Sequence, residues 1–306
     1  MMFYFNSKDA EREAVFREMV ESGFPDLTFV TPQDSFAASQ VRYIFTWLPM
    51  ADWSDYPALE VVFSVSAGVD QFTDLPSHVT LIRMQDPGNT QRVVDFVMTG
   101  ALACLRNLPE HGAAQRQGEW RALPSRLVSD THVGVLGLGD IGRRAAEALC
   151  RVGFAVSGWA RSSKSLEGIR CLTGAQGLRQ MLGDCDIVVC LLPLTPETER
   201  LMDADFFAAM KPGSSLVHAG RGRHCDDAAL GAALRSGHLK NAVLDVFDTE
   251  PLPPEDPRWH LPRTLITPHV AGHIDPVTAA ENVRENLARH RDGQPLRWQV
   301  DLTKGY

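Results

Sequence analysis

Short apolar runs alternate with amphipathic stretches along most of the chain. In the N-terminal part, the spacing of apolar residues predicts a helix over Asp9–Ser22 that ends at Gly23. Strands that alternate with helices or loops indicate a parallel sheet whose two faces are covered. Runs rich in aromatic and β-branched residues predict such strands at Phe3–Phe5, Thr28–Val30, Arg42–Trp47, Leu59–Val65 and Thr80–Met84.

A long helix is predicted next, over Gln91–Leu108. Its apolar side is formed by Val93, Val94, Val97, Ala101, Cys104 and Leu105. A second series of strands then begins at His132–Leu136, and the pattern becomes helical again over Pro276–Asp292. The further strands of this series are expected at Ala155–Trp159, Ile187–Leu192, Ser215–Val217, Ala242–Leu244 and Leu265–Thr267.

These elements predict an α/β fold with two doubly wound parallel-sheet domains. In one compact arrangement, the chain leaves the first domain near residue 90, builds the second, and returns to the first after Pro268. Periodicity alone does not establish that return.

Length and charge narrow the classes of function. The 306 residues are enough for two domains of ordinary size. Thirty basic and 38 acidic residues give a net charge of −8, which disfavours nucleic acid and anionic membranes as partners, so any basic site must be local. No apolar run approaches the roughly 18 residues of a membrane helix, and the start lacks the features of a secretory signal. The six cysteines contain no C-x-x-C pair, so we expect reduced thiols, a cytoplasmic protein and no metal cofactor.

The most specific local motif is a glycine loop that follows the strand at His132–Leu136 and precedes a helix over Arg143–Val152. In a strand, G-x-G-x-x-G, helix context, the first glycine makes the turn, the second lets the backbone approach a pyrophosphate, and the third lets the helix pack on the strand. The alternative is a tight turn without a ligand. The loop, which we expect to bind a dinucleotide, consists of Gly137, Leu138, Gly139, Asp140, Ile141 and Gly142.

A basic, hydroxyl-rich segment follows the next predicted strand, where many dinucleotide-binding chains have a carboxylate for the ribose 2′-OH. Here the chain has Arg161, Ser162, Ser163 and Lys164. A carboxylate would repel a 2′-phosphate, whereas a guanidinium and hydroxyls can bind one. A solvated surface loop is the alternative. The pattern therefore predicts NADP(H) specificity.

Three residues with the chemistry of 2-oxo acid reduction follow predicted strands of the second series: Arg221, Glu250 and His269. Such a reaction needs a cation for the substrate carboxylate and carbonyl, an acid that protonates the oxygen, and a carboxylate that holds the acid in its charged form. Because ligands bind at the carboxyl ends of the strands in open α/β sheets, the three could converge on one site. Singly, each is better explained as a surface charge, a structural histidine or a loop residue, but the three together after a cofactor-binding fold favour the chemical interpretation.

The chain resembles the D-isomer-specific 2-hydroxyacid dehydrogenases. The motifs that carry this resemblance are GLGDIG, LLPLTPETERLM, GRGRHCDDAAL, LDVFDTEPLP and TPHVAGH. The segments SVSAGVDQF, WARSSK and VDLTKGY are similar to the glyoxylate/hydroxypyruvate reductase A branch. The resemblance covers nearly the whole chain. It implies a discontinuous, flavodoxin-like substrate-binding domain at 1–95 and 272–306 and a Rossmann NAD(P)-binding domain at 96–271. It also implies a homodimer.

The resemblance also assigns roles to residues. It implies that Arg221 binds substrate, that His269 is the general acid and that Glu250 is its partner. The backbone amides around Ala67, Gly68 and Val69 would receive the substrate carboxylate, with the substrate between the domains. Trp47 either forms a wall of the substrate pocket or is an ordinary core aromatic. Further residues expected near the cofactor are Leu192, Pro193, Thr198, Ala219, Gly220, Asp245 and Gly272.

Two positions depart from the family pattern. His218 stands where family members often carry Asn, which leaves the hydrogen bonding around Arg221 open. Asp95 replaces a glutamate that is common on the long inter-domain helix.

Together these features predict an NADPH-dependent reductase of small 2-oxo acids, with glyoxylate and hydroxypyruvate as the first candidates. Two alternatives stay open: a dehydrogenase of a larger D-2-hydroxy acid, and a dinucleotide-sensing binding protein on the same fold. A third, an α/β protein that uses no cofactor, would show no nucleotide-induced thermal shift.

Overall fold

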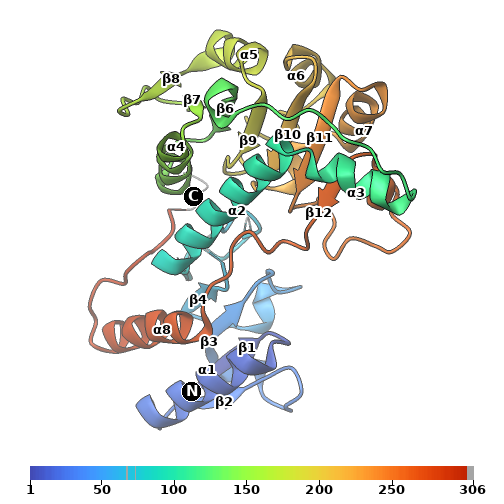
Figure 1. The fold of residues 1–306 in the computed structure, drawn as a ribbon. Coiled ribbons are helices and arrows are strands. Elements are labelled where there is room, and N and C mark those ends of the chain that lie inside the picture. The colour runs from blue at the N-terminus through green and yellow to red at the C-terminus, as the bar shows by residue number, and fades with distance from the viewer. Residues whose placement is uncertain (67, 73, 302–306) are drawn as a thin grey trace. The chain divides into compact units, whose positions relative to one another are not determined.

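The computed structural model describes residues 1–66, 68–72 and 74–301, and the chain divides into two compact units (Figure 1). Unit 1 comprises Met1–Asn89 and the segment from Ile274 onward. Unit 2 is Thr90–His273. The chain thus returns to unit 1 after completing unit 2.

Unit 1 contains a parallel sheet with strand order β2-β1-β3-β4-β5, which is the flavodoxin-like order. Helix α1 (Ala10–Gly23) begins where Asp9 accepts a hydrogen bond from the amide of Arg12, and α8 (Pro276–Arg291) begins with the equivalent cap by Asp275. Aromatic residues of alternate strand positions pack with both helices in one core. The strands are β1 (Met2–Asn6), β2 (Thr28–Val30), β3 (Val41–Thr46), β4 (Val61–Ser64) and β5 (Thr80–Ile82).

Unit 2 contains a second parallel sheet, with strand order β12-β11-β10-β9-β6-β7-β8. The order reverses direction between β6 and β9, which is the switch point at which a Rossmann sheet binds dinucleotides. The strands are β6 (His132–Leu136), β7 (Ala155–Trp159), β8 (Ile169–Leu172), β9 (Ile187–Cys190), β10 (Ser214–His218), β11 (Leu239–Leu244) and β12 (Thr264–Ile266).

Helices cover both faces of this sheet because its strands are apolar on both sides (Figure 1). In β6, Val133 and Val135 pack with residues of α2 and α4, while Leu136 packs with residues of α5, α6 and α7. The helices are α2 (Pro87–Leu105), α3 (Leu108–Arg116), α4 (Asp140–Val152), α5 (Gly174–Asp184), α6 (Ala204–Ala209) and α7 (Asp227–Ser236). Short 3-10 turns are η1 (Ala38–Gln40), η2 (Trp53–Asp55), η3 (Val128–Asp130), η4 (Gly222–His224) and η5 (Pro257–His260).

The predicted α/β class with two parallel sheets is confirmed, and the differences are local. The expected helix over Gln91–Leu108 begins earlier, at Pro87, and ends at Leu105, before α3 starts as a separate helix. The edge strand β8 was not predicted, because only Ile169 of its four residues is buried and no apolar run marks it. Helices α5, α6 and α7 were also not predicted from the pattern.

The cysteines are all free thiols, as expected. Within residues 1–66, 68–72 and 74–301, no helix combines the length and the apolar character needed to cross a membrane.

Candidate active site

The glycine loop after β6 has the geometry of a dinucleotide-binding turn. Gly137 has a φ of +96°, and a β-carbon there would lie 2.9 Å from the carbonyl oxygen of Leu191. A β-carbon at Gly142 would lie 1.8 Å from the oxygen of Gly137, so only glycine allows α4 to start this close to the turn. At Gly139, by contrast, a β-carbon would meet nothing within 4 Å. The middle glycine therefore leaves its side of the loop open, at the N-terminus of α4.

The rest of the loop is held by the neighbouring strand. Gly137 donates its amide to the oxygen of Trp159 at 2.9 Å. Leu138 is buried against Gly158, where a β-carbon would lie 2.5 Å from a Leu138 methyl group. Asp140 and Ile141 open α4. The loop is thus anchored beside the end of β7, where the basic segment begins.

The basic segment after β7 is an exposed turn. Arg161, Ser162, Ser163 and Lys164 are all exposed, and the chain returns to β8 through a bridge between Leu166 and Ile169. The positive charge of Arg161 helps to lower the pKa of Glu197, a contribution smaller than that of the hydrogen bond from Thr195. Arg161 and the loop after β9 are therefore neighbours in the fold.

The loop after β9 is held in shape by hydrogen bonds among its own residues. The Thr198 hydroxyl donates to the oxygen of Pro193 at 2.7 Å and accepts from the amide of Thr195 at 2.8 Å. This hydroxyl closes the turn and shapes the loop; the expected role of Thr198 in cofactor binding stays a prediction. Leu192 is buried and Pro193 is exposed.

Arg221 follows β10 after Ala219 and Gly220 and has an extended backbone. Its guanidinium donates to the oxygen of Gly220 at 2.8 Å. The backbone is held on both sides by imidazoles, because its amide donates to His224 Nδ1 at 3.1 Å and its oxygen accepts from His218 Nε2 at 2.9 Å. His218, which stands where the family often has Asn, thus donates a hydrogen bond to the Arg221 main chain.

His269 and Glu250 form a direct pair. The distance between His269 Nδ1 and Glu250 Oε2 is 2.6 Å, and both side chains are partly exposed. The other carboxylate oxygen of Glu250 accepts from the amide of Phe247 at 2.8 Å. The carboxylate therefore fixes the histidine ring in one orientation, with Nδ1 toward Glu250.

Arg221 lies within the electrostatic reach of this pair. Burial would raise the pKa of Glu250, but hydrogen bonds from His269 and the Phe247 amide, followed by the charges of His269 and Arg221, hold it below its ordinary value. Contact between the loops explains this proximity, because a β-carbon at Gly222 would lie 1.9 Å from the carbonyl carbon of Phe247. The structure brings Arg221, Glu250 and His269 together within unit 2.

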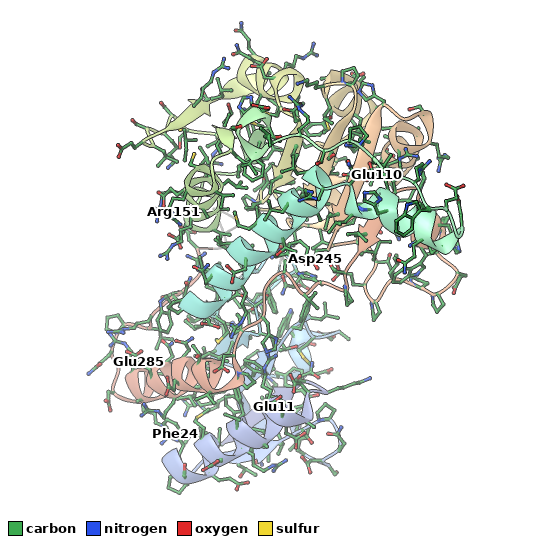
Figure 2. The ribbon with its side chains drawn as sticks, in the orientation of Figure 1. Glu11, Phe24, Glu110, Arg151, Asp245 and Glu285 are labelled. Carbon is green, nitrogen blue, oxygen red and sulfur yellow. The ribbon has the colours of Figure 1, made fainter. Side chains whose placement is uncertain are left out.

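Asp245, which is labelled in Figure 2, directly follows β11. It is fully buried, and its carboxylate accepts hydrogen bonds from Thr267, Val270 and Ala271. One oxygen accepts from the Thr267 hydroxyl at 2.5 Å and the Val270 amide at 2.9 Å, and the other from the Ala271 amide at 2.9 Å. The backbone oxygen of Asp245 accepts from the amide of His269. Asp245 therefore anchors the segment that carries His269 and precedes Gly272; its expected proximity to the nicotinamide stays a prediction.

Four of the expected substrate-binding positions, Trp47 and residues 67–69, belong to unit 1. Trp47 follows β3 and is 45% exposed, so the alternative of an ordinary core aromatic is wrong. Its oxygen accepts from Gln71 at 2.8 Å. The Gly68 oxygen accepts from the Ser66 hydroxyl at 2.6 Å, and Val69 is buried. Ala67 lies outside the described residues. The role of these positions in substrate binding stays a prediction.

Some residues that shape the site were not singled out from the sequence. Gly222 permits the contact between the Arg221 and Glu250 loops, Thr267 bonds Asp245, and His224 accepts the Arg221 amide. All lie inside motifs that were quoted, within three positions of a residue chosen there, but their roles depend on contacts between separate loops. Asp95, the second departure, accepts a hydrogen bond from Gln91 on the exposed side of α2.

A separate cavity of about 830 Å³ lies in unit 2 beside α3 and β12. None of the predicted catalytic or cofactor residues lines it. The lining residues include Arg116, Arg121, Trp259, Leu261 and Leu265. We therefore locate the candidate chemistry by the side-chain geometry described above and not by this cavity.

Comparison with known proteins gives one consistent answer. Residues 98–271 match the family model of the D-isomer specific 2-hydroxyacid dehydrogenase, NAD binding domain. A glyoxylate/hydroxypyruvate reductase A from Serratia proteamaculans is 34% identical over 273 residues, which cover 86% of this chain and 87% of that protein.

Solved structures agree over nearly full length. A D-isomer specific 2-hydroxyacid dehydrogenase from Xanthobacter autotrophicus, in complex with NADPH and MES, is 38% identical with a TM-score of 0.85, and the match covers 99% of each chain. An NADPH-dependent glyoxylate/hydroxypyruvate reductase from Sinorhizobium meliloti, in complex with NADP and sulfate, is 35% identical with a TM-score of 0.86, covering 100% of this chain and 99% of that one. This chain belongs to the D-isomer specific 2-hydroxyacid dehydrogenase family of oxidoreductases.

Proposed function

We propose that this protein is an NADPH-dependent reductase that converts small 2-oxo acids, glyoxylate and hydroxypyruvate first, into 2-hydroxy acids. The observation that carries the proposal is the 2.6 Å pair of His269 and Glu250 within the electrostatic reach of Arg221. The relatives whose names include glyoxylate/hydroxypyruvate reductase support the choice of substrates.

The glycine loop fits the proposed cofactor. The positive φ at Gly137 and the close packing at Gly142 bring the N-terminus of α4 up to the turn, and Gly139 leaves room beside it. Backbone amides at a helix N-terminus bind pyrophosphate. The exposed turn with Arg161 and Lys164 would hold the 2′-phosphate, because a guanidinium forms charge-assisted hydrogen bonds with phosphate oxygens. The solved relatives in complex with NADPH or NADP support this choice.

When bound, NADPH would supply the hydride for C2 of the substrate. Arg221 would bind the substrate carboxylate and stabilise the negative charge that develops on the carbonyl oxygen. Its main chain is suited to this task, because two imidazoles and the Gly222 contact hold it in place.

His269 would protonate the carbonyl oxygen. Its Nδ1 is engaged by Glu250, so Nε2 is the nitrogen that would transfer the proton. The carboxylate stabilises the imidazolium before transfer, and the low pKa of Glu250 keeps the carboxylate charged at neutral pH. Asp245 would keep the His269 backbone in place through its bonds to residues 267–271.

The decisive experiment is NADPH oxidation with a panel of 2-oxo acids, with NADH measured in parallel. The highest kcat/KM values with glyoxylate and hydroxypyruvate would support the proposal. Preference for long or branched 2-oxo acids would indicate the larger-substrate dehydrogenase. Tight nucleotide binding without turnover on any of them would indicate a dinucleotide-sensing protein.

We further propose that the protein is a homodimer built through unit 2. Exposed apolar side chains occur on α3 and on the segment after it: Leu108, Trp120, which is fully exposed, and Leu127. A second copy would cover them, since an exposed tryptophan beside a cavity lined by Trp259 and Leu261 is typical of an interface core. A twofold axis would let the two copies exchange the same contact.

A further inference from the structure

Three buried side chains with metal-binding chemistry lie together at the ends of β9 and β10. Cys190 and His218 are register partners on these strands, so their side chains emerge on the same face of the sheet. His224 reaches them from η4. One ligand-type atom of each residue lies within 4.8 Å of those of the other two, and Cys190 Sγ is 3.9 Å from His224 Nδ1. All three residues are at most 1% exposed.

The hydrogen bonds of the two imidazoles determine which nitrogen offers a lone pair. His218 Nε2 lies 2.9 Å from the oxygen of Arg221, and His224 Nε2 lies 3.2 Å from the oxygen of Pro193. A carbonyl oxygen only accepts, so both Nε2 atoms carry hydrogen and both Nδ1 atoms carry the lone pair. His218 is 1% exposed, and burial disfavours the charged form of its ring.

His218 Nδ1 has a further property. It is a buried polar atom without a hydrogen-bond partner among residues 1–66, 68–72 and 74–301. Buried acceptors are almost always satisfied, and one that is not points to a missing ligand, ion or water.

We infer that Cys190, His218 and His224 form an inhibitory site for a thiophilic divalent ion of the Zn²⁺ type. Neutral imidazole nitrogen and thiolate sulfur are the donors that such ions select. Ligating histidines nearly always donate their other N–H to a carbonyl or carboxylate, as both rings do here. The bond lengths of tetrahedral zinc place sulfur and nitrogen about 3.6 Å apart, so the 3.9 Å separation needs little adjustment.

Metal binding releases one proton from the site. The Cys190 thiol loses its proton to solvent as the sulfur–metal bond forms, while the imidazoles bind through existing lone pairs. Because binding releases this proton, it should tighten as pH rises. Because the ligands are buried, entry requires local opening, and binding should be slow.

Inhibition is expected because the proposed metal would compete with a hydrogen bond that holds Arg221. This expectation of inhibition rests on the proposed function. His224 Nδ1 accepts the amide of Arg221 at 3.1 Å in the metal-free chain. An ion at that nitrogen would take the lone pair, and the Arg221 amide would lose its acceptor. The Arg221 backbone would shift, so KM for the 2-oxo acid should rise slowly after Zn²⁺ is added and return after chelation.

The test uses Co²⁺ as a spectroscopic probe on the full-length, reduced, metal-free protein. We expect one equivalent of Co²⁺ to give a thiolate-to-metal charge-transfer band and the intense visible bands of a tetrahedral site, both removed by Zn²⁺. Cys190→Ser should abolish the charge-transfer band and protect turnover from Zn²⁺. Cys225→Ser, a matched control next to His224, should retain both responses.

A second variant covers the case in which Cys190→Ser does not fold. His218→Asn keeps an N–H for the Arg221 oxygen but has no imidazole lone pair, and it should lower Co²⁺ affinity by more than about tenfold. The site is refuted if the wild-type protein gives no thiolate band, or if the band persists in Cys190→Ser or moves to Cys225. The spectra need no turnover, so failure of the reductase proposal would leave the metal test intact, and full occupancy without any change in KM would refute the inhibition alone.

Discussion

Glu250 Oε2 lies 2.6 Å from Nδ1 of His269, although the two residues are 19 positions apart on separate loops. If His269 is the proton donor, His269→Ala should reduce turnover by roughly 10²- to 10⁴-fold and leave NADPH binding nearly unchanged. In Glu250→Gln, the imidazolium loses its charged partner, so the pH at which reduction declines should move downward. Steady-state rates from pH 5 to 9 and NADPH fluorescence titrations would check both. Normal turnover in His269→Ala would remove this residue from the mechanism.

The same pair should appear in the pH dependence of stability. The folded pKa of Glu250 lies below its ordinary value of 4.5, so its stabilising contribution is fully present above that value and is lost as pH falls through the folded pKa. The difference in urea midpoint between wild type and Glu250→Gln should therefore shrink as pH falls through the acidic range below 4.5. A difference that grows on acidification would contradict the lowered pKa.

Arg221 should contribute to both substrate binding and the transition state. Arg221→Lys retains the charge but loses the planar fork that binds a carboxylate through two parallel bonds, so kcat/KM for glyoxylate should still be poor. Arg223→Lys is a suitable control, because Arg223 is exposed and pairs with Glu199. Equal kcat/KM in Arg221→Lys and wild type would show that two-point binding by the guanidinium is not used.

The exposed turn after β7 should discriminate between the two nicotinamide cofactors. A charge-assisted contact to phosphate contributes about 1.5–3 kcal/mol, or about ten- to more than a hundredfold in affinity. Arg161→Ala should weaken NADPH by that factor and change NADH only severalfold, Lys164→Ala should act in the same way but less, and Arg161→Asp should shift preference toward NADH.

The measurement is kcat/KM for both cofactors at fixed ionic strength. Equal losses with NADPH and NADH in Arg161→Ala would mean that the turn supports the fold and does not bind the phosphate. A wild-type enzyme that already prefers NADH would contradict the assignment altogether.

The proposed dimer can be tested on the fully exposed tryptophan. Trp120→Glu should convert the dimer into monomers at micromolar concentration, because a charge would be buried at the interface. Val277→Glu, at an exposed apolar position on α8 in unit 1, should leave the mass unchanged. Light scattering after size-exclusion chromatography gives the mass directly, and a monomeric wild type or a dimeric Trp120→Glu would refute this interface.

Local patterns in the sequence were enough for several parts of the fold. The turn at Gly137, the strand before it and the helix after it were predictable because a positive φ, an apolar run and an amphipathic stretch are properties of neighbouring residues. Arg221, Glu250 and His269 were identified by residue type, by their positions after predicted strands and by family resemblance. The edge strand β8 left no such signal, since three of its four residues are not buried.

Only the tertiary structure determined which loops, distant in sequence, lie in contact. Periodicity reports whether a side chain faces the core, but it contains no information about which loops meet. It therefore left Trp47 open between a pocket wall and the core, and the partners of His218 unassigned. The sheet order places the ends of β10, β11 and β12 side by side, and only there does Asp245 bind residues 267–271, Gly222 contact Phe247 and His218 hold Arg221. Arg221, Glu250 and His269 could be chosen as candidates from the sequence, whereas their mutual geometry arises from the packing of separate strands into one sheet.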